Sequence, residues 1–142
     1  MLYLGAAAVY LINFGIHAMI TGAIIVATRH CYNLTSDAGL FVRVSSLLFV
    51  TMVGLIIAHL VEIAVWTGYL VLIGLEIKNA TVFEFVFENY TALGYGDALP
   101  ENAPRLIGPV VSLNGVLLIG WSVAIIFEVM RMAELQFGRR DR

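Results

Sequence analysis

The chain is poor in charged residues and in cysteine. Only 13% of its 142 residues are charged, whereas 61% are hydrophobic. Too few polar residues are present to cover a water-facing surface, which excludes an ordinary soluble domain and makes lipid the solvent for much of the chain. The single cysteine, Cys31, excludes an intrachain disulfide framework. A formal net charge of −2 and the lack of a basic face give no sign of nucleic-acid binding.

Sequence patterns for chemistry are also scarce. We find no Cys/His cluster with metal-ligand spacing, no nucleophile–base pair and no phosphate-binding loop. No enzyme activity and no cofactor are therefore expected. No segment carries arginine at every third position, which argues against a voltage sensor. No pair of internal repeats is visible, which argues against transport by alternating access.

Long apolar runs dominate what remains. Three are long enough to cross a bilayer, which takes about 20 apolar residues. They lie within residues 3–28, 44–75 and 105–131. The sequence therefore predicts an all-α membrane protein with one domain and three transmembrane helices, the first of them retained rather than cleaved as a signal peptide.

The arginines predict the orientation. The loop 29–43 carries Arg29 and Arg43 against one acidic residue, and the C-terminal tail 132–142 carries three further arginines. The segments on the other side hold more acidic than basic residues. By the positive-inside rule, the loop and the tail lie in the cytoplasm, and the N-terminus lies outside. We expect a multi-pass protein of the cell membrane.

A short apolar piece between the second and third runs cannot span the bilayer. Thr81 and Glu84 form a capping-box pattern that predicts a helix ending near Tyr90. Three phenylalanines at every second position, Phe83, Phe85 and Phe87, fit a strand instead. An unpaired strand in lipid would leave backbone groups without hydrogen bonds, so we favour a re-entrant helix.

Residues 91–97 read Thr-Ala-Leu-Gly-Tyr-Gly-Asp, and this motif resembles the selectivity filter of potassium channels. A dehydrated potassium ion needs a cage of backbone carbonyls, and glycines permit the backbone angles that aim them. The resemblance covers roughly Leu47 to Met132 and is to bacterial two-helix channels, here with one extra N-terminal helix. It implies an outer helix at 44–75, a pore helix and filter at 81–97, and an inner helix at 105–131. It also implies a homotetramer with C4 symmetry that passes K⁺ passively.

The resemblance also assigns residues to the filter. The filter would comprise Thr91, Ala92, Leu93, Gly94, Tyr95 and Gly96. The carbonyls of Ala92, Leu93, Gly94 and Tyr95 would hold K⁺. Glu88 and Asp97 match a carboxylate pair that braces the filter of some relatives and shares one proton.

Two filter positions depart from the family pattern. Ala92 stands where most relatives have a threonine whose hydroxyl completes the innermost ion site, and Leu93 stands where valine or isoleucine is usual. Glu84 and Phe85 stand where many relatives have a pair of aromatic residues around the filter. Ala92 and this incomplete pair motivate one alternative, a weakly selective monovalent cation channel. A second alternative is a non-conducting subunit that assembles with another channel.

The third run contains candidate gate and cavity residues. Gly115 and Gly120 match glycines of the family's inner helix, and Gly115 is either a bending hinge or a site of close packing. Asn114 either faces the cavity or bonds a neighbouring helix. Glu128 either belongs to a ring of carboxylates at the inner mouth or pairs with Arg131.

His59 and Glu62 form a polar pair in the second run. They are three residues apart, so they share one helix face. A charged pair inside a membrane is costly and calls for a partner. We favour a hydrogen-bonded tie to another helix, with Asn13 and His17 as candidate partners, over a proton sensor.

Overall fold

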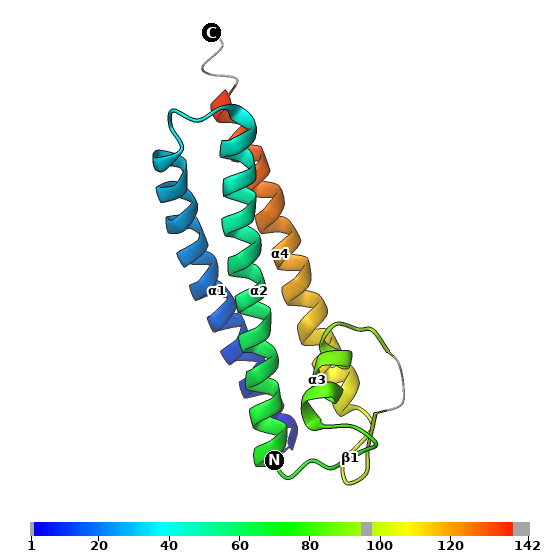
Figure 1. The fold of residues 1–142 in the computed structure, drawn as a ribbon. Coiled ribbons are helices and arrows are strands. Elements are labelled where there is room, and N and C mark those ends of the chain that lie inside the picture. The colour runs from blue at the N-terminus through cyan, green and yellow to red at the C-terminus, as the bar shows by residue number, and fades with distance from the viewer. Residues whose placement is uncertain (1, 95–97, 138–142) are drawn as a thin grey trace.

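A computed structural model describes residues 2–94 and 98–137, with side chains described as far as Ala133. Three long helices stand side by side, and a short helix and a two-stranded pair lie at one end of them (Figure 1). In chain order the elements are α1 (Leu2–Leu34), α2 (Leu40–Leu72), β1 (Ile77–Lys78), α3 (Val82–Tyr90), β2 (Leu99–Pro100) and α4 (Ile107–Phe137).

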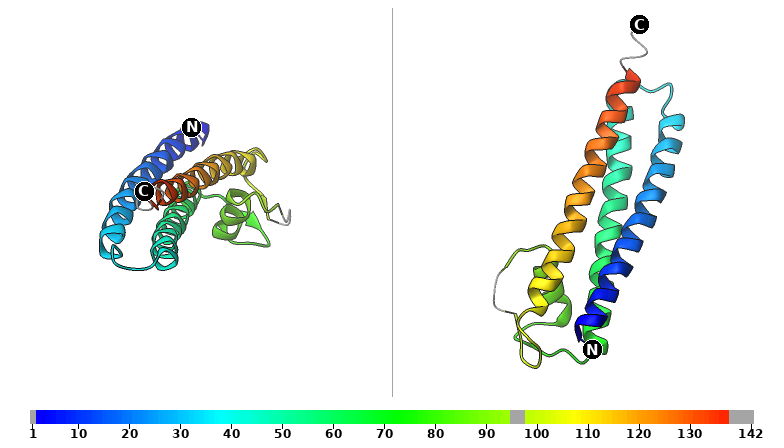
Figure 2. Two further views of the ribbon diagram at one scale, coloured as in Figure 1. Left: turned by 90° about the horizontal axis from the view of Figure 1, so that it is seen from above. Right: turned by 180° about the vertical axis from the view of Figure 1, so that it is seen from behind.

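The three long helices confirm the predicted spans. Each is long and apolar enough to cross a membrane. At about 1.5 Å rise per residue, the 33 residues of α1 and of α2 exceed the roughly 30 Å hydrocarbon core. The N-terminal end lies at the same end of the bundle as α3, and the α1–α2 connection lies at the opposite end, as does the end of α4 (Figure 2).

The helix boundaries differ from the sequence prediction. The predicted loop 29–43 is mostly helical, because α1 runs to Leu34 and α2 begins at Leu40. α2 ends at Leu72 instead of residue 75, and α4 continues to Phe137 beyond the predicted 131. The apolar run predicts where contact with lipid ends. The helix itself continues as far as its backbone hydrogen bonds do.

A glycine ends α2. Gly74 has φ +71, and its N–H donates to the Val71 carbonyl while Leu75 N–H donates to Leu70. These two bonds and the left-handed residue form a Schellman motif, which satisfies the last carbonyls of a helix. The chain leaves α2 at this point and turns toward α3.

α3 is a helix, so the strand alternative for its phenylalanines is wrong. The predicted capping box is confirmed: the Glu84 N–H donates to Thr81 Oγ1 at 3.1 Å, and the Thr81 N–H donates to Glu84 Oε2 at 2.6 Å. Hydrogen bonds from the Thr81 backbone and side chain lower the pKa of Glu84. Local chemistry thus fixes where α3 begins.

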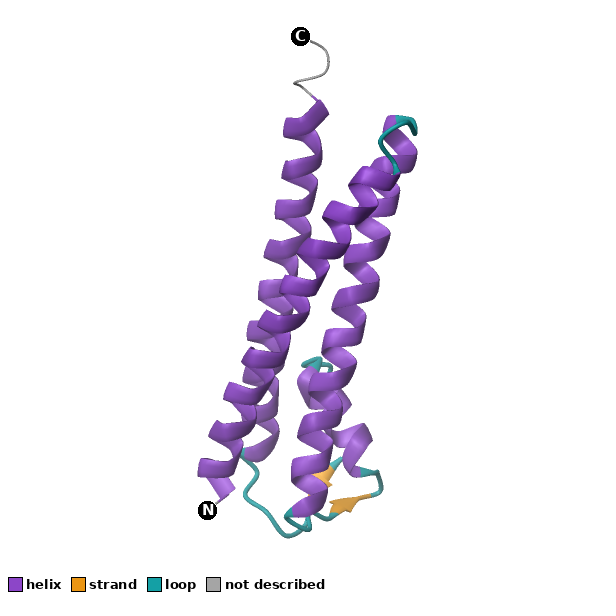
Figure 3. Cartoon of the chain, turned by 90° about the vertical axis from the view of Figure 1, so that its left-hand side faces the viewer, coloured by secondary structure: helices purple, strands orange, loops and turns teal. Residues whose placement is uncertain are grey.

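An antiparallel pair of short strands was not predicted. Ile77 pairs with Pro100, and Lys78 pairs with Leu99 (Figure 3). The side chain of Asn102 adds to the pair by donating to the Gly74 carbonyl and accepting from the Glu76 N–H. The strand pair thereby joins the segment that enters α3 to the segment that leaves the 91–97 motif.

Buried apolar side chains form two unequal clusters. The larger lies at the end of the bundle that holds α3 and includes Trp66, Val86, Tyr90, Ile107 and Val111, all 1% exposed or less. The smaller lies near the opposite end, and its buried members among the described side chains are Leu47, Val129 and Ala133. Packing is therefore concentrated around α3.

Candidate functional site

The C-terminal end of α3 makes a sharp turn into the 91–97 motif. Ala92 N–H donates to the Asn89 carbonyl at 2.9 Å, and Leu93 N–H donates to the Glu88 carbonyl at 3.0 Å. This is a second Schellman motif, with Ala92 at the left-handed position and φ +55. Glycine is the usual residue there because a Cβ is strained in that region. Gly94 follows with φ +66.

Four of the predicted filter residues, Thr91 to Gly94, belong to this turn. Tyr95, Gly96 and Asp97 lie outside the described residues, so the predicted Glu88–Asp97 pair remains a prediction. Glu88 is partly buried and lines a cavity of about 150 Å³ behind the turn. Gly94, Arg105 and other residues of the α3–α4 connection line the same cavity.

α4 carries a stripe of small residues that receives the end of α3. Gly108, Ser112 and Gly115 lie on one face, and Ser112 Oγ donates to the Asn89 carbonyl at 2.7 Å. A Cβ at Gly115 would collide with the Tyr90 carbonyl, and one at Gly108 would collide with the Asn89 side chain. The contact matches the close-packing alternative for Gly115. Gly120 has open space where a Cβ would lie.

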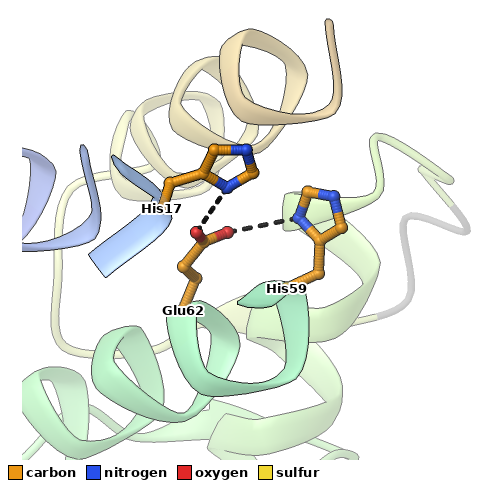
Figure 4. A group of neighbouring side chains, drawn as sticks. All are labelled: His17, His59 and Glu62. Atoms are coloured by element: carbon orange, nitrogen blue, oxygen red, sulfur yellow. Dashed lines mark hydrogen bonds and ion pairs between the residues drawn. The ribbon is translucent and has the colours of Figure 1, made fainter. Parts of the chain in front are cut away.

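Near the C-terminal end of α3, polar side chains from all four helices meet. The carboxylate of Glu62 is fully buried and lies between His17 and His59 (Figure 4). Oε1 is 2.8 Å from His17 Nδ1, and Oε2 is 3.2 Å from His59 Nδ1. Tyr90, the last residue of α3, donates its hydroxyl to Glu62 Oε2. The predicted His59–Glu62 contact is thus part of a larger network.

Asn114 occupies the neighbouring layer. Its Oδ1 accepts from Asn13 Nδ2 at 2.9 Å and from Trp66 Nε1 at 2.8 Å, and the residue is fully buried. Asn13 also donates to the Glu62 carbonyl at 3.3 Å. These contacts match the alternative in which Asn114 bonds neighbouring helices. They also place both expected partners from α1, Asn13 and His17, against α2.

Near the other end of α4, Glu128 pairs with Arg131. Two nitrogens of the guanidinium lie 2.8 and 2.9 Å from the two carboxylate oxygens, and both side chains are exposed. The contact matches the local-pair alternative.

One group of neighbouring residues was not predicted from the sequence. His17, His59 and Glu62 lie close enough to hold a metal ion, although no cluster with metal-ligand spacing was predicted. His17 is 42 positions before His59, and only the packing of α1 on α2 brings them together. A histidine in the middle of a mostly apolar helix was the available signal.

These features define a class: a helical membrane protein in which a capped short helix and a glycine-containing turn sit between two spanning helices. Residues 47–132 match the sequence pattern of a family described as an ion channel. The match covers more than half of the chain, and the chain belongs to this ion-channel family. No curated protein and no solved structure matches it. The protein is therefore a multi-pass membrane protein of the channel class.

Proposed function

We propose that the chain forms a potassium-selective channel, with residues 91–97 as its filter. The observation that carries the proposal is the turn at the end of α3, where Ala92 and Gly94 take left-handed backbone angles. Such angles reorient successive carbonyls, and a cage of carbonyls is what a dehydrated K⁺ requires. The ion ligands would be the carbonyls of residues 92–95, and the C-terminal end of the α3 dipole favours a cation nearby.

A carbonyl cage around one axis needs several chains, so we propose a C4 homotetramer. α3 would be its re-entrant pore helix, α2 its outer helix and α4 its inner helix, with α1 at the periphery. Large apolar side chains that are exposed on α3 and α4 support this assembly. They are 40–56% exposed: Phe83, Phe87, Leu113, Val116 and Leu117.

The proposed orientation places the filter turn toward the outside. The N-terminal end of α1 and α3 share one end of the bundle, and the α1–α2 connection shares the other end with the end of α4 (Figure 1). The arginines of the tail follow α4 in the sequence. Positive charge favours the cytoplasmic side.

Ion flux through purified protein in liposomes tests the proposal. We expect flux under a K⁺ gradient and none under an equal Na⁺ gradient. Gly94→Ala should abolish the flux, because a Cβ is strained at φ +66. Gly68→Ala is the matched control, since a Cβ at Gly68 meets open space within α2. The mass of the assembly should equal four chains of 15.6 kDa.

A weakly selective cation channel is the second candidate, and Ala92 favours it. Alanine has no hydroxyl to complete an innermost ion site. Equal K⁺ and Na⁺ flux that Gly94→Ala abolishes would establish this second function. The absence of flux under either gradient would contradict both and favour a non-conducting subunit.

A further inference from the structure

We propose that His17, Glu62 and His59, together with the Tyr90 hydroxyl, form a binding site for a divalent transition-metal ion of the zinc class. One nitrogen of each histidine and one carboxylate oxygen lie within 4.8 Å of one another. Imidazole nitrogen and carboxylate oxygen are ligands that zinc prefers. The site contains no residue of the 91–97 motif, and the inference does not depend on ion conduction.

The separations suit a tetrahedral ion. Ligand atoms around zinc lie about 3.4 Å apart, because its bonds to nitrogen and oxygen are about 2.0–2.1 Å long. His17 Nδ1 and His59 Nδ1 lie 2.8 and 3.2 Å from the two oxygens of Glu62. His59 Nδ1 lies 2.8 Å from Tyr90 Oη. The ligands would move outward to make room for the ion, and the hydrogen bond between Tyr90 and Glu62 would break as the tyrosine proton leaves.

The burial and charge of the site also favour an ion. Glu62 and His17 have fully buried side chains inside the bundle, and a lone carboxylate there is costly. Zn²⁺ would meet two neutral imidazoles, the carboxylate and the Tyr90 oxygen, whose proton passes to bulk water. The two positive charges then balance one carboxylate and one phenolate, and the buried site becomes neutral.

A neighbouring hydroxyl orients one of the ligands. His59 Nε2 lies 2.9 Å from Ser122 Oγ on α4, which can accept the Nε2 proton when Nδ1 binds the ion. Partners of this kind fix the ring and the tautomer of metal-binding histidines. The side chain of His59 is also 21% exposed, so an ion would enter from its side.

The four ligands come from three helices, so a bound ion would connect these helices. His17 lies on α1, His59 and Glu62 lie on α2, and Tyr90 ends α3. A bound ion would tie the N-terminal helix to the residue that immediately precedes the 91–97 motif. α1 would thereby act on the filter turn without touching it.

Cobalt(II) titration of the purified, chelator-treated protein tests this site. We expect one Co²⁺ per chain, with the visible absorption of a tetrahedral nitrogen–oxygen site, and its displacement by Zn²⁺ but not by Mg²⁺. His17→Gln and His59→Gln should each weaken binding by about 100-fold, and Ser122→Ala, which alters only the outer shell, by about tenfold. His30→Gln, an exposed histidine of α1, is the matched control and should leave binding unchanged.

Two results would overturn the proposal. One is a wild-type protein that binds no Co²⁺ at one ion per chain. The other is equal affinity in the wild type, His17→Gln and His59→Gln. A histidine variant that loses its helical circular dichroism has unfolded and does not test binding. The titrations of the wild type and of Ser122→Ala then test the proposed site. The titration reads binding alone, so its failure is distinct from a failure of ion flux.

Discussion

The two halves of the helical bundle differ in how firmly they are held. The half around α3 contains most of the buried apolar residues, and polar contacts there cross between all four helices. In the opposite half, the described apolar cluster between α2 and α4 consists of Leu47, Val129 and Ala133, next to a cavity of about 250 Å³. A channel needs a rigid filter and a movable gate. The proposed filter lies in the α3 half, and we expect the other half to be the part that moves.

The two halves also use different kinds of contact. Lipid is as apolar as leucine, so apolar packing alone holds membrane helices together weakly, and small residues and hydrogen bonds matter more. The α3 half has both, in Gly108 and Gly115 on α4 and in Asn114 at the helix crossing. In the other half, the described polar contacts of α4 include the exposed Glu128–Arg131 pair within the helix itself.

The largest expected effect is at the seat of α3 on α4. Gly115→Ala should destabilise the protein by about 3 kcal/mol, because the new Cβ collides with the Tyr90 carbonyl. Gly120→Ala, five residues along the same helix, meets open space and should be neutral or slightly stabilising. Thermal unfolding in detergent measures both. Equal changes of stability in the two variants would show that the close approach of α3 to α4 at Gly115 has no special effect on stability.

The next effect contrasts one residue from each half. Asn114→Ala removes the acceptor of two buried donors, Asn13 Nδ2 and Trp66 Nε1, and should cost about 2 kcal/mol. Val129→Ala in the small cluster should cost about 1 kcal/mol or less. Denaturant unfolding of the two variants side by side checks the order. A larger loss for Val129→Ala would reverse the proposed division of the bundle.

A smaller effect is expected at the filter turn. Ala92→Gly should stabilise the protein by about 1 kcal/mol, because glycine relieves the strain at φ +55. Ala92→Thr should destabilise it, since a β-branched residue suits that region least. Ala80→Gly is the control: Ala80 lies outside the left-handed region, so the change should destabilise. The unfolding midpoints of the three variants test this, and a loss of stability in Ala92→Gly would contradict it.

The smallest effect concerns the capping box of α3. Because the pKa of Glu84 is lowered in the folded protein, its contribution is fully present above the ordinary pKa of about 4.3. It is lost as the pH falls through the lower folded value. The wild type should therefore lose more stability than Glu84→Gln between about pH 5 and pH 3. Parallel pH profiles of the two proteins would rule out this contribution.

The parts of the molecule that local chemistry specifies were predictable from the sequence. Apolar runs predicted the three spans. Thr81 and Glu84, which are three residues apart, predicted where α3 begins. The end of α2 was misplaced, although Gly74 at a left-handed position gave a local signal for it. The β1–β2 pair was missed because two-residue strands have no periodicity to detect.

The polar network depends on packing and was predictable only in part. The i, i+3 spacing placed His59 and Glu62 on one face, and the polar residues of the first span suggested Asn13 and His17 as partners. Nothing in the sequence placed Tyr90 and Ser122 at the same point, because they lie on other helices. The close approach of Tyr90 to Gly115 likewise depends on how α3 and α4 cross.

The most direct test of the proposed function is the reversal potential of the purified channel in a planar bilayer, with K⁺ on one side and an equal concentration of Na⁺ on the other. Selective conduction through residues 91–97 predicts a large reversal potential of the sign set by K⁺ flow. A reversal potential near zero, from currents that Gly94→Ala abolishes, would contradict potassium selectivity and leave a cation pore that does not discriminate.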